Sequence, residues 1–308
     1  MNIDYCKYEL QQNSALNRVD LSSAREGVLL RIDQGQSGYA SLQTWPELGD
    51  PTVEQCLADL HTGTTNPIVD RALHAASLFH TSFLDTPQVQ SHATLPRLAG
   101  SDMLRAVDAD FSAVKVKRGK DWMRLRKKTE AFIKAYPCLR FRFDFNGALK
   151  SHLELHQFLS SIPAQQVDFI EDPFSDPELA ATWEGFPIAY DRIIPETLNL
   201  QNHYLIAKPA IQSLEQIQQL AGDHPDRVIF TSYMDHPLGQ LYALKVAQQF
   251  YHQHQITAPP LGGLATQDLF APTPYHALIG KAGPQLSPPT SAELITILEQ
   301  EVWTPLGS

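Results

Sequence analysis

The stretch Leu139-Arg140-Phe141-Arg142-Phe143-Asp144-Phe145-Asn146 predicts a short buried strand that ends in a carboxylate and an amide. A helical spacing of apolar residues follows over Leu149–Leu159. The next apolar stretch also ends in acids, at Glu171-Asp172-Pro173. Repeated units of strand and helix are typical of folds built on a parallel sheet.

The same alternation continues through the last two thirds of the chain and predicts a parallel α/β barrel. The predicted strands are Ala93–Leu98, Ser112–Lys117, Leu139–Asn146, Val167–Asp172, Ile188–Asp191, Tyr204–Lys208, Arg227–Ser232 and Ile256–Leu261. A doubly wound open sheet is the alternative. The sequence has no glycine-rich nucleotide-binding motif after any of these strands, which favours the barrel.

The residues before this repeat have a different pattern. Gly27–Ile32 and Ser37–Leu42 predict two strands joined by a polar turn. Helices are expected after Asp50-Pro51 and over Ile68–Phe79. Antiparallel strands followed by helices indicate a small α+β domain.

The composition excludes several classes of protein. The chain has 308 residues, 43% of them hydrophobic, which is enough for a sizeable core and about two domains. Twenty-four basic and 34 acidic residues give a formal charge of −10, which disfavours nucleic-acid binding. The sequence has no apolar run of membrane-spanning length and no apolar leader region. With three widely spaced cysteines, Cys6, Cys56 and Cys138, we expect a cytoplasmic protein with reduced thiols.

Charged residues stand at the C-terminal ends of five successive predicted strands, where the active sites of such barrels lie. They are Lys115 and Lys117, Asp144 with Asn146, Glu171, Asp191, and Lys208. The three acids are about one barrel unit apart, so they can converge on one point. Three oxygen ligands without histidine or cysteine suit Mg²⁺.

Lysines beside such a dication indicate a specific chemistry. A neutral lysine can remove a proton from the carbon next to a carboxylate when a metal stabilises the resulting enediolate. The substrate is then a small-molecule carboxylate, and nearby positive charges should lower the pKa of the base. Taken singly, each motif has a structural explanation, as a solvated strand edge, a turn or a cap. The ordered series favours a catalytic site.

In this order the motifs resemble those of the enolase superfamily. The shared elements are Lys-x-Lys at 115–117, Asp-x-Asn at 144–146, Glu-Asp-Pro at 171–173, Asp191 and Lys208-Pro209. Within the superfamily, the chain most resembles the o-succinylbenzoate synthase family. That resemblance rests on Arg142, Pro209, Thr-Ser-Tyr-Met-Asp-His-Pro-Leu-Gly at 231–239 and Gly-Gly-Leu-Ala-Thr-Gln-Asp-Leu at 262–269.

The resemblance implies an α/β fold, a modified (β/α)7β TIM-type barrel with an α+β N-terminal capping domain. The cap would comprise residues 1–92, and the barrel with the active site residues 93–285. Residues 286–308 would pack back on the cap. The polar stretch Asn13–Glu26 would be a loop that closes over the substrate.

The implied activity is Mg²⁺-dependent syn-dehydration of 2-succinyl-6-hydroxy-2,4-cyclohexadiene-1-carboxylate to o-succinylbenzoate in menaquinone biosynthesis. Lys117 would be the base, Lys208 would stabilise the enediolate, and Lys115 would tune Lys117. Asp144, Glu171 and Asp191 would bind Mg²⁺. The substrate would be contacted by Arg142, Asn146, Ser232 and Gly263, the last two at its succinyl carboxylate.

The sequence departs from the superfamily pattern at Arg192, because an acid usually follows the metal-binding aspartate. We expect Arg192 to point away from the metal, since a cation beside it would repel Mg²⁺. Two other functions stay open: an N-acylamino acid racemase or dipeptide epimerase on the same barrel, and an inert ligand-binding barrel. Pro209 favours the dehydratase over the epimerase, and the intact ligand and base positions argue against the inert barrel.

Overall fold

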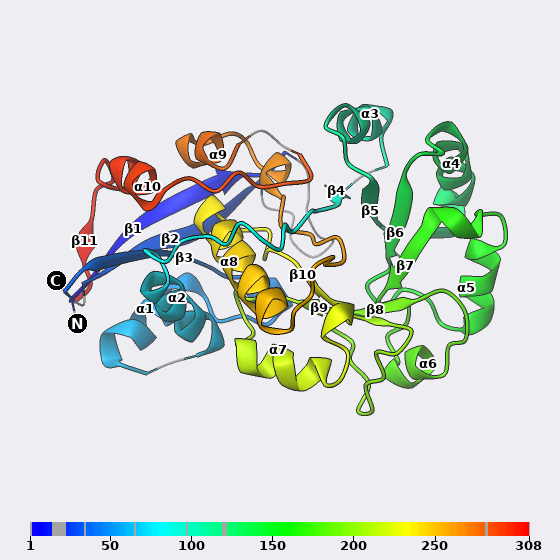
Figure 1. Cartoon of the computed structure of the whole chain (residues 1–308), viewed down its shortest axis with the longest axis horizontal. Helices are drawn as coiled ribbons and strands as arrows, with labels where there is room; N and C mark the ends of the chain where they lie inside the picture. The colour runs from blue at the N-terminus through cyan, green and yellow to red at the C-terminus, as the bar shows by residue number, and fades with distance from the viewer. Residues whose placement is uncertain are drawn as a thin grey trace.

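Parallel strands of one curled sheet form the frame of the C-terminal part of the chain. The computed structural model describes residues 2–13, 23–33, 35–64, 66–96, 98–118, 122–280 and 283–307 (Figure 1). Within these ranges the sheet has the order β10-β9-β8-β7-β6-β5-β4. Its strands are β4 (Ala93–Leu95), β5 (Ala113–Lys117), β6 (Arg140–Asp144), β7 (Val167–Glu171), β8 (Ile188–Tyr190), β9 (Tyr204–Ala207) and β10 (Val228–Phe230). Each lies inside a segment that the sequence predicts as a strand.

The sheet closes through two glycines rather than through the predicted strand at Ile256–Leu261, so that prediction is wrong. Gly262 forms a parallel bridge with Ser91, beside β4, and Gly263 forms one with Thr231, beside β10. A Cβ atom at Gly262 would lie 2.7 Å from the Phe230 carbonyl oxygen. The close backbone approach therefore requires glycine, and this last strand carries no apolar pattern that would mark it.

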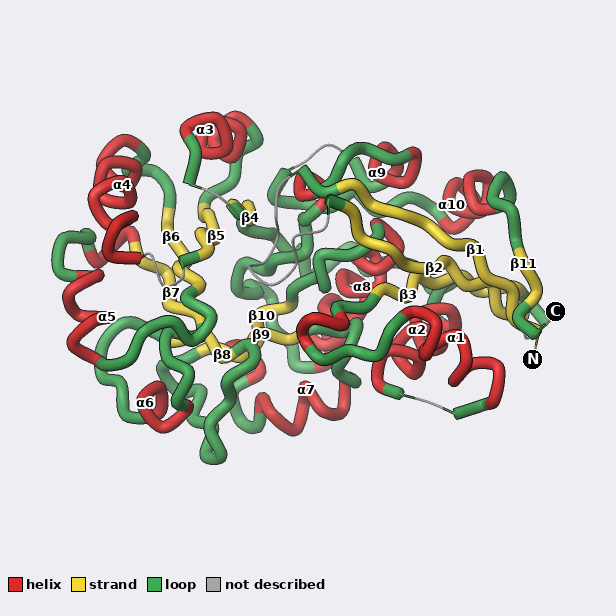
Figure 2. Tube along the Cα trace, turned by 180° about the vertical axis from the view of Figure 1, so that it is seen from behind, coloured by secondary structure: helices red, strands yellow, loops and turns green. Residues whose placement is uncertain are grey.

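Helices cover the outer face of the parallel sheet (Figure 2). They are α3 (Gly100–Asp108), α4 (Trp122–Ala135), α5 (His152–Leu159), α6 (Pro177–Ala181), α7 (Leu214–Ala221) and α8 (Pro237–Gln253). Their starts follow local capping chemistry: the Ser151 side chain accepts a hydrogen bond from Glu154 N, and Ser213 forms a capping box with Gln216. This alternation of strand and helix confirms the predicted barrel.

The N-terminal part forms a separate antiparallel sheet with the order β11-β1-β2-β3. Its strands are β1 (Asn2–Gln11), β2 (Ala24–Asp33), β3 (Ser37–Gln43) and β11 (Thr304–Pro305), and α1 (Val53–Thr62) and α2 (Pro67–Ser77) pack on it. Short helices α9 (Pro274–Leu278) and α10 (Ser291–Leu298) precede β11. Figure 1 shows this sheet at one end of the molecule, with both chain ends beside it. The arrangement confirms an α+β domain before the barrel.

Two details of this domain differ from the sequence-based expectations. Strand β1 was not predicted, because most of its residues are polar and only Ile3 and Leu10 are buried. The expected loop at residues 13–26 is shorter, since Ala24 already pairs with Gln11 in the sheet. Residues 14–22 of that loop lie outside the described residues. Within the described part of the chain, no helix is both long and apolar enough to cross a membrane.

Hydrogen bonds join the N-terminal domain to the loop that follows β10. Trp45 Nε1 donates to the Tyr233 carbonyl oxygen at 3.0 Å, and Gln43 Nε2 donates to that of Met234 at 2.9 Å. The Tyr233 hydroxyl donates to Asp50 Oδ2 at 2.8 Å. These contacts fix residues 233 and 234 above the C-terminal ends of the barrel strands.

Arg142 places a buried positive charge in the interior of the barrel. Arg142 points into it, as Asp144 does, because alternate residues of a strand share one face. Its guanidinium is 2% exposed and donates to Asp168 Oδ2 at 2.7 Å, to the Leu261 carbonyl oxygen and to His92 Nδ1. Burial and the charge of Arg142 lower the pKa of His92, which therefore accepts as a neutral ring.

Removing the carboxylate of Asp168 should destabilise the protein strongly, because it leaves Arg142 buried without its counter-ion. For Asp168→Asn we expect a loss of about 3–5 kcal/mol in the free energy of unfolding, measured by urea denaturation. Arg140 pairs with the same carboxylate at 3.0 Å but is 47% exposed. Arg140→Gln should therefore cost about 0–1 kcal/mol. Equal losses in the two variants would contradict this account.

His236 makes stability depend on pH. The ring is buried between Tyr8 and Tyr275, and its Nδ1 accepts from Leu238 N at the start of α8. Burial, together with the charge of His276, lowers the pKa of His236 from 6.5 to about 3. Below pH 6.5 the His236 side chain becomes protonated in the unfolded chain, whereas in the folded protein it stays neutral down to about pH 3. The free energy of unfolding therefore falls as the pH drops from 6.5 toward 3.

His236→Asn keeps a side chain that can cap α8 but removes the titration. Thermal unfolding measured from pH 7 to pH 4 should therefore show a weaker loss of stability in this variant than in the wild type, by up to a few kcal/mol at the acid end. The exposed His252 provides the matched control, and His252→Asn should follow the wild-type curve. A wild-type pH dependence in His236→Asn would contradict the assignment.

Candidate active site

The predicted catalytic residues lie at adjacent strand ends of the barrel. Lys117, Asp144 and Glu171 are the last residues of β5, β6 and β7, and they are successive neighbours in register. Asp191 and Lys208 directly follow β8 and β9. The structure therefore brings the lysines and the carboxylates of the sequence prediction to one mouth of the barrel.

Lys115 stands between two of the carboxylates. Its Nζ atom lies 3.1 Å from Asp144 Oδ2 and 2.5 Å from Glu171 Oε1. Burial alone would lower the pKa of Lys115, but Asp144, Glu171 and Asp191 together raise it above its ordinary value. Lys115 is thus a fixed cation that neutralises part of the charge of the mouth.

Four carboxylates lie close to one another at the mouth, those of Asp144, Glu171, Asp172 and Asp191. Burial raises the pKa of Glu171, and the charges of Asp144, Asp191 and Asp172 raise it further against the effect of Lys115. Buried acids that repel one another in this way attract a further cation. The electrostatics of the site therefore favour binding of a positive ion.

Lys117 has the opposite electrostatic environment from Lys115. Burial lowers the pKa of Lys117, and the charges of Lys115 and Lys208 lower it further, against the effect of Asp144 and Glu171. Its Nζ atom donates a weak hydrogen bond at 4.0 Å to the sulfur of Met234, in the loop after β10. A lysine with a lowered pKa is closer to the neutral form that a general base requires.

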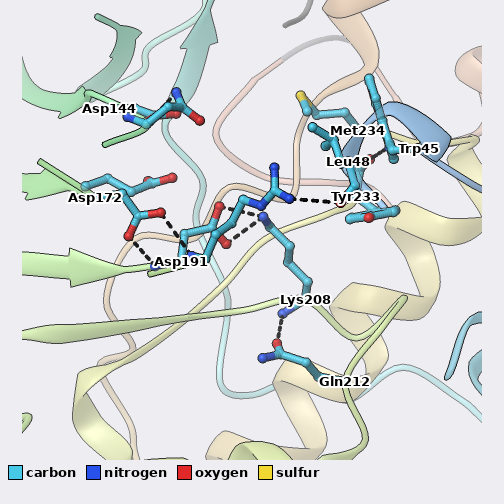
Figure 3. Close-up of polar contacts among 12 residues, drawn as sticks. Trp45, Leu48, Asp144, Asp172, Asp191, Lys208, Gln212, Tyr233 and Met234 are labelled. Carbon is cyan, nitrogen blue, oxygen red and sulfur yellow. Dashed lines mark hydrogen bonds and ion pairs between the residues drawn. The ribbon is translucent and has the colours of Figure 1, made fainter. Parts of the chain in front are cut away.

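On the other side of the mouth, Lys208 pairs with Asp191 (Figure 3). Its Nζ atom lies 2.5 Å from Asp191 Oδ1 and 2.6 Å from Oδ2. Burial alone would raise the pKa of Asp191, but Lys208, Lys115 and Arg192 lower it below its ordinary value. Asp191 is therefore ionised, and both of its oxygens contact Lys208.

Asp172 orients this side of the site, a role that the sequence analysis missed. Its carboxylate accepts from Asp191 N at 3.0 Å and from Arg192 N at 2.9 Å (Figure 3). Asp172 is 4% exposed and has a φ of +38°, a backbone conformation that non-glycine residues rarely adopt. The available signal was an acid directly after Glu171 and directly before a proline.

The four predicted substrate contacts bind protein atoms in this structure. Asn146 donates to Asp144 Oδ1 at 2.7 Å and so orients a catalytic carboxylate. The Ser232 hydroxyl is buried, lies 2.8 Å from Thr266 Oγ1 and accepts from Met234 N. Gly263 uses its backbone to close the barrel, and Arg142 lies below the mouth. Direct contact of these residues with substrate stays a prediction.

The carboxylates have the right chemistry for a hard dication but are not gathered around one point. Within the described residues, no three histidine, cysteine or acidic side chains lie close enough to hold a metal ion. Lys115 separates Asp144 from Glu171, and Lys208 pairs with Asp191. The set of carboxylate oxygen donors nevertheless fits Mg²⁺.

Comparisons with known proteins agree with this architecture. Residues 3–79 match the family model described as o-succinylbenzoate synthase, N-terminal domain. An o-succinylbenzoate synthase of Bdellovibrio bacteriovorus is 27% identical over 310 residues, which cover 93% of this chain and 92% of the relative.

Solved structures with the same fold include two enzymes. An o-succinylbenzoate synthase from Thermosynechococcus elongatus BP-1 with Mg in its active site has a TM-score of 0.68 at 15% identity, covering 97% of this chain and 100% of the other. A dipeptide epimerase from Enterococcus faecalis V583 with Mg and L-Leu-L-Tyr has a TM-score of 0.72 at 14% identity, with 94% and 97% covered. The chain therefore has the fold of the enolase superfamily and resembles o-succinylbenzoate synthase in sequence, as the motifs at its strand ends predict.

Proposed function

We propose that the protein catalyses the syn-dehydration of 2-succinyl-6-hydroxy-2,4-cyclohexadiene-1-carboxylate to o-succinylbenzoate, a carbon–oxygen lyase reaction of menaquinone biosynthesis. The observation that carries the proposal is the meeting of Lys117 and Lys208 with three carboxylates at adjacent strand ends. The sequence likeness to the Bdellovibrio enzyme supports this choice of reaction.

In the proposed reaction Lys117 acts as base and then as acid. Its neutral amine removes the proton from the carbon next to the ring carboxylate, and the electrons of that C–H bond form the enediolate. The C–O bond to the hydroxyl group then breaks on the same face. Lys117 returns the proton to the departing hydroxyl, which leaves as water, and the ring becomes aromatic. The lowered pKa of Lys117 supports this role.

Lys208 would act as a fixed cation. It is held by both oxygens of Asp191, and it would stabilise the negative charge of the enediolate from the side opposite Lys117. Lys115 would keep the pKa of Lys117 low through its own charge. These roles require Lys208 and Lys115 to stay protonated while Lys117 loses and regains its proton.

Asp144, Glu171 and Asp191 would hold Mg²⁺, which when bound neutralises charge that develops on the substrate carboxylate. Binding would require the three carboxylates to approach one another and Lys115 and Lys208 to give up part of their contacts. The repulsion of Glu171 by the neighbouring buried carboxylates supports the proposal, since a dication would relieve it.

An epimerase or racemase on the same barrel is the second candidate. Lysines on two sides of a substrate carbon can remove a proton from one face and return it to the other, and a dipeptide epimerase shares this fold. The dehydratase is favoured because Lys208 is bound to Asp191 as a cation and is followed by Pro209.

We also propose the domain division drawn from the sequence, with a cap at 1–92, a barrel at 93–285 and a C-terminal segment at 286–308. The pairing of β11 with β1 supports the return of the last segment to the cap. For location we propose the cytoplasm, supported by the free thiols of all three cysteines.

Substitution of the two lysines should separate the candidate reactions. Lys117→Ala should abolish dehydration and the exchange of the substrate α-proton with solvent, a loss of at least about 10²–10⁴-fold. Lys208→Arg keeps the charge but provides no base, because guanidinium stays protonated, so part of the exchange should remain. Deuterium incorporation followed by NMR, beside a turnover assay, measures both quantities.

The alternatives give different results in the same experiment. A two-base epimerase would lose the exchange of one enantiomer in each variant. An inert barrel would show no exchange in the wild type. Wild-type exchange in Lys117→Ala would show that another group is the base.

Glu171→Gln should weaken Mg²⁺ binding by more than the roughly 10- to 100-fold that is typical of losing an outer-shell partner. It removes one charged ligand from the proposed site and keeps the shape of the side chain. Calorimetric titration with MgCl₂ measures the affinity, and Glu184→Gln, on an exposed loop, is the matched control. Unchanged affinity in Glu171→Gln would remove Glu171 from the ligand set.

A further inference from the structure

Arg192 lies where the cap meets the mouth of the barrel. Asp172 binds the backbone N–H groups of both Asp191 and Arg192, which fixes the two residues as a pair. The carboxylate of Asp191 contacts Lys208, while the guanidinium of Arg192 donates to the Leu48 carbonyl oxygen of the cap at 3.0 Å (Figure 3). The guanidinium of Arg192 thus contacts the cap, while its charge still lowers the pKa of Asp191.

Among the acids that the structure describes, Asp191 is affected by the charge of this guanidinium but does not form an ion pair with it. Across the described ranges of the chain, Arg192 forms no ion pair within 4.0 Å, and its side chain is exposed. The nearby Asp50 is engaged, since its Oδ2 accepts from Trp45 N and from the Tyr233 hydroxyl. A guanidinium has five N–H donors, and the Leu48 carbonyl uses one of them, so a bidentate carboxylate can still be bound.

The other cations of the mouth are differently placed. Lys115 lies between Asp144 and Glu171, and Lys208 lies against Asp191. The Ser232 hydroxyl, expected from the sequence at the succinyl carboxylate, is bound to Thr266 and Met234 instead. Of these groups, Arg192 is the one that offers an exposed positive charge to a second carboxylate of a substrate.

We propose that Arg192 binds the distal carboxylate of a dicarboxylate substrate at the seam between cap and barrel, and so selects substrates that carry this second acid. The inference rests on the proposed function, whose substrate has a ring carboxylate and a succinyl carboxylate. Arg192 would contact the succinyl carboxylate, several bonds from the reacting carbon. It is therefore a specificity residue and takes no part in proton transfer.

The test compares o-succinylbenzoate with its analogue in which the succinyl carboxylate is an amide, titrated calorimetrically into the full chain with saturating Mg²⁺. The wild type should bind the diacid at least about tenfold more tightly than the amide, because a charge-assisted bidentate contact is lost in the amide. In Arg192→Gln the two ligands should bind equally, with the affinity of the amide for the wild type. Arg192→Lys should give an intermediate preference.

Arg227→Gln is the matched control, since it removes an arginine that precedes β10 at the opposite end of the barrel, and it should keep the wild-type preference. In turnover, Arg192→Gln should raise KM for the diacid and leave kcat within about threefold.

Three results would overturn the inference: no preference for the diacid in the wild type, an unchanged preference in Arg192→Gln, or an equal loss for both ligands, which would indicate a role only in docking the cap. If the wild type binds the diacid selectively but does not dehydrate its precursor, the proposed function fails and the role of Arg192 stands.

Discussion

The ion pairs between lysines and carboxylates at the barrel mouth are the interaction on which the rest of the site depends. Transfer of several like charges from water into a protein interior costs several kcal/mol per ion unless opposite charges compensate them. Lys115 between Asp144 and Glu171, and Lys208 on Asp191, supply that compensation. Burial, together with the charges of Lys115 and Lys208, lowers the pKa of Lys117 against the effect of Asp144 and Glu171.

This distribution of charge follows from the register of the sheet. Side chains alternate along a strand, so the charged residues at the strand ends and the layer below them share the inner face. That lower layer contains Phe169, Ala189, Ile206 and Ile229, with the Arg142 guanidinium 4.5 Å from the Phe169 ring. A shift of one residue in any strand would exchange its charged residue with a core residue on the outer face. The barrel therefore keeps its catalytic geometry through the same packing that stabilises it.

Much of this could be predicted from the sequence, because apolar strands that end in charged residues leave a local pattern. Asp144, Glu171 and Lys208 were found in this way. Closure of the barrel at Gly262 and Gly263 depends on a close backbone approach between distant segments, which no local pattern reports. Strand β1 has only Ile3 and Leu10 buried, so it lacks the apolar alternation that marks a strand in a sequence.

Contacts between distant residues explain the remaining differences at the site. The partners of Arg142, at Asp168, His92 and Leu261, come from three separate segments and cannot be read from the Arg-x-Asp motif. The Ser232 hydroxyl bonds to Thr266 for the same reason, and the contact of Arg192 with Leu48 depends on how the two domains dock.

The pairing of the first strand with the last one has a consequence for biosynthesis. Asp4 and Tyr5 pair with Pro305 and Thr304, and Trp303 packs 5.8 Å from the Tyr39 ring on the same sheet. A ribosome releases the N-terminal domain first but delivers these residues only after the whole barrel. The nascent cap therefore carries an uncovered β1 edge during synthesis of the entire barrel, and polar residues along that edge limit its pairing with other chains.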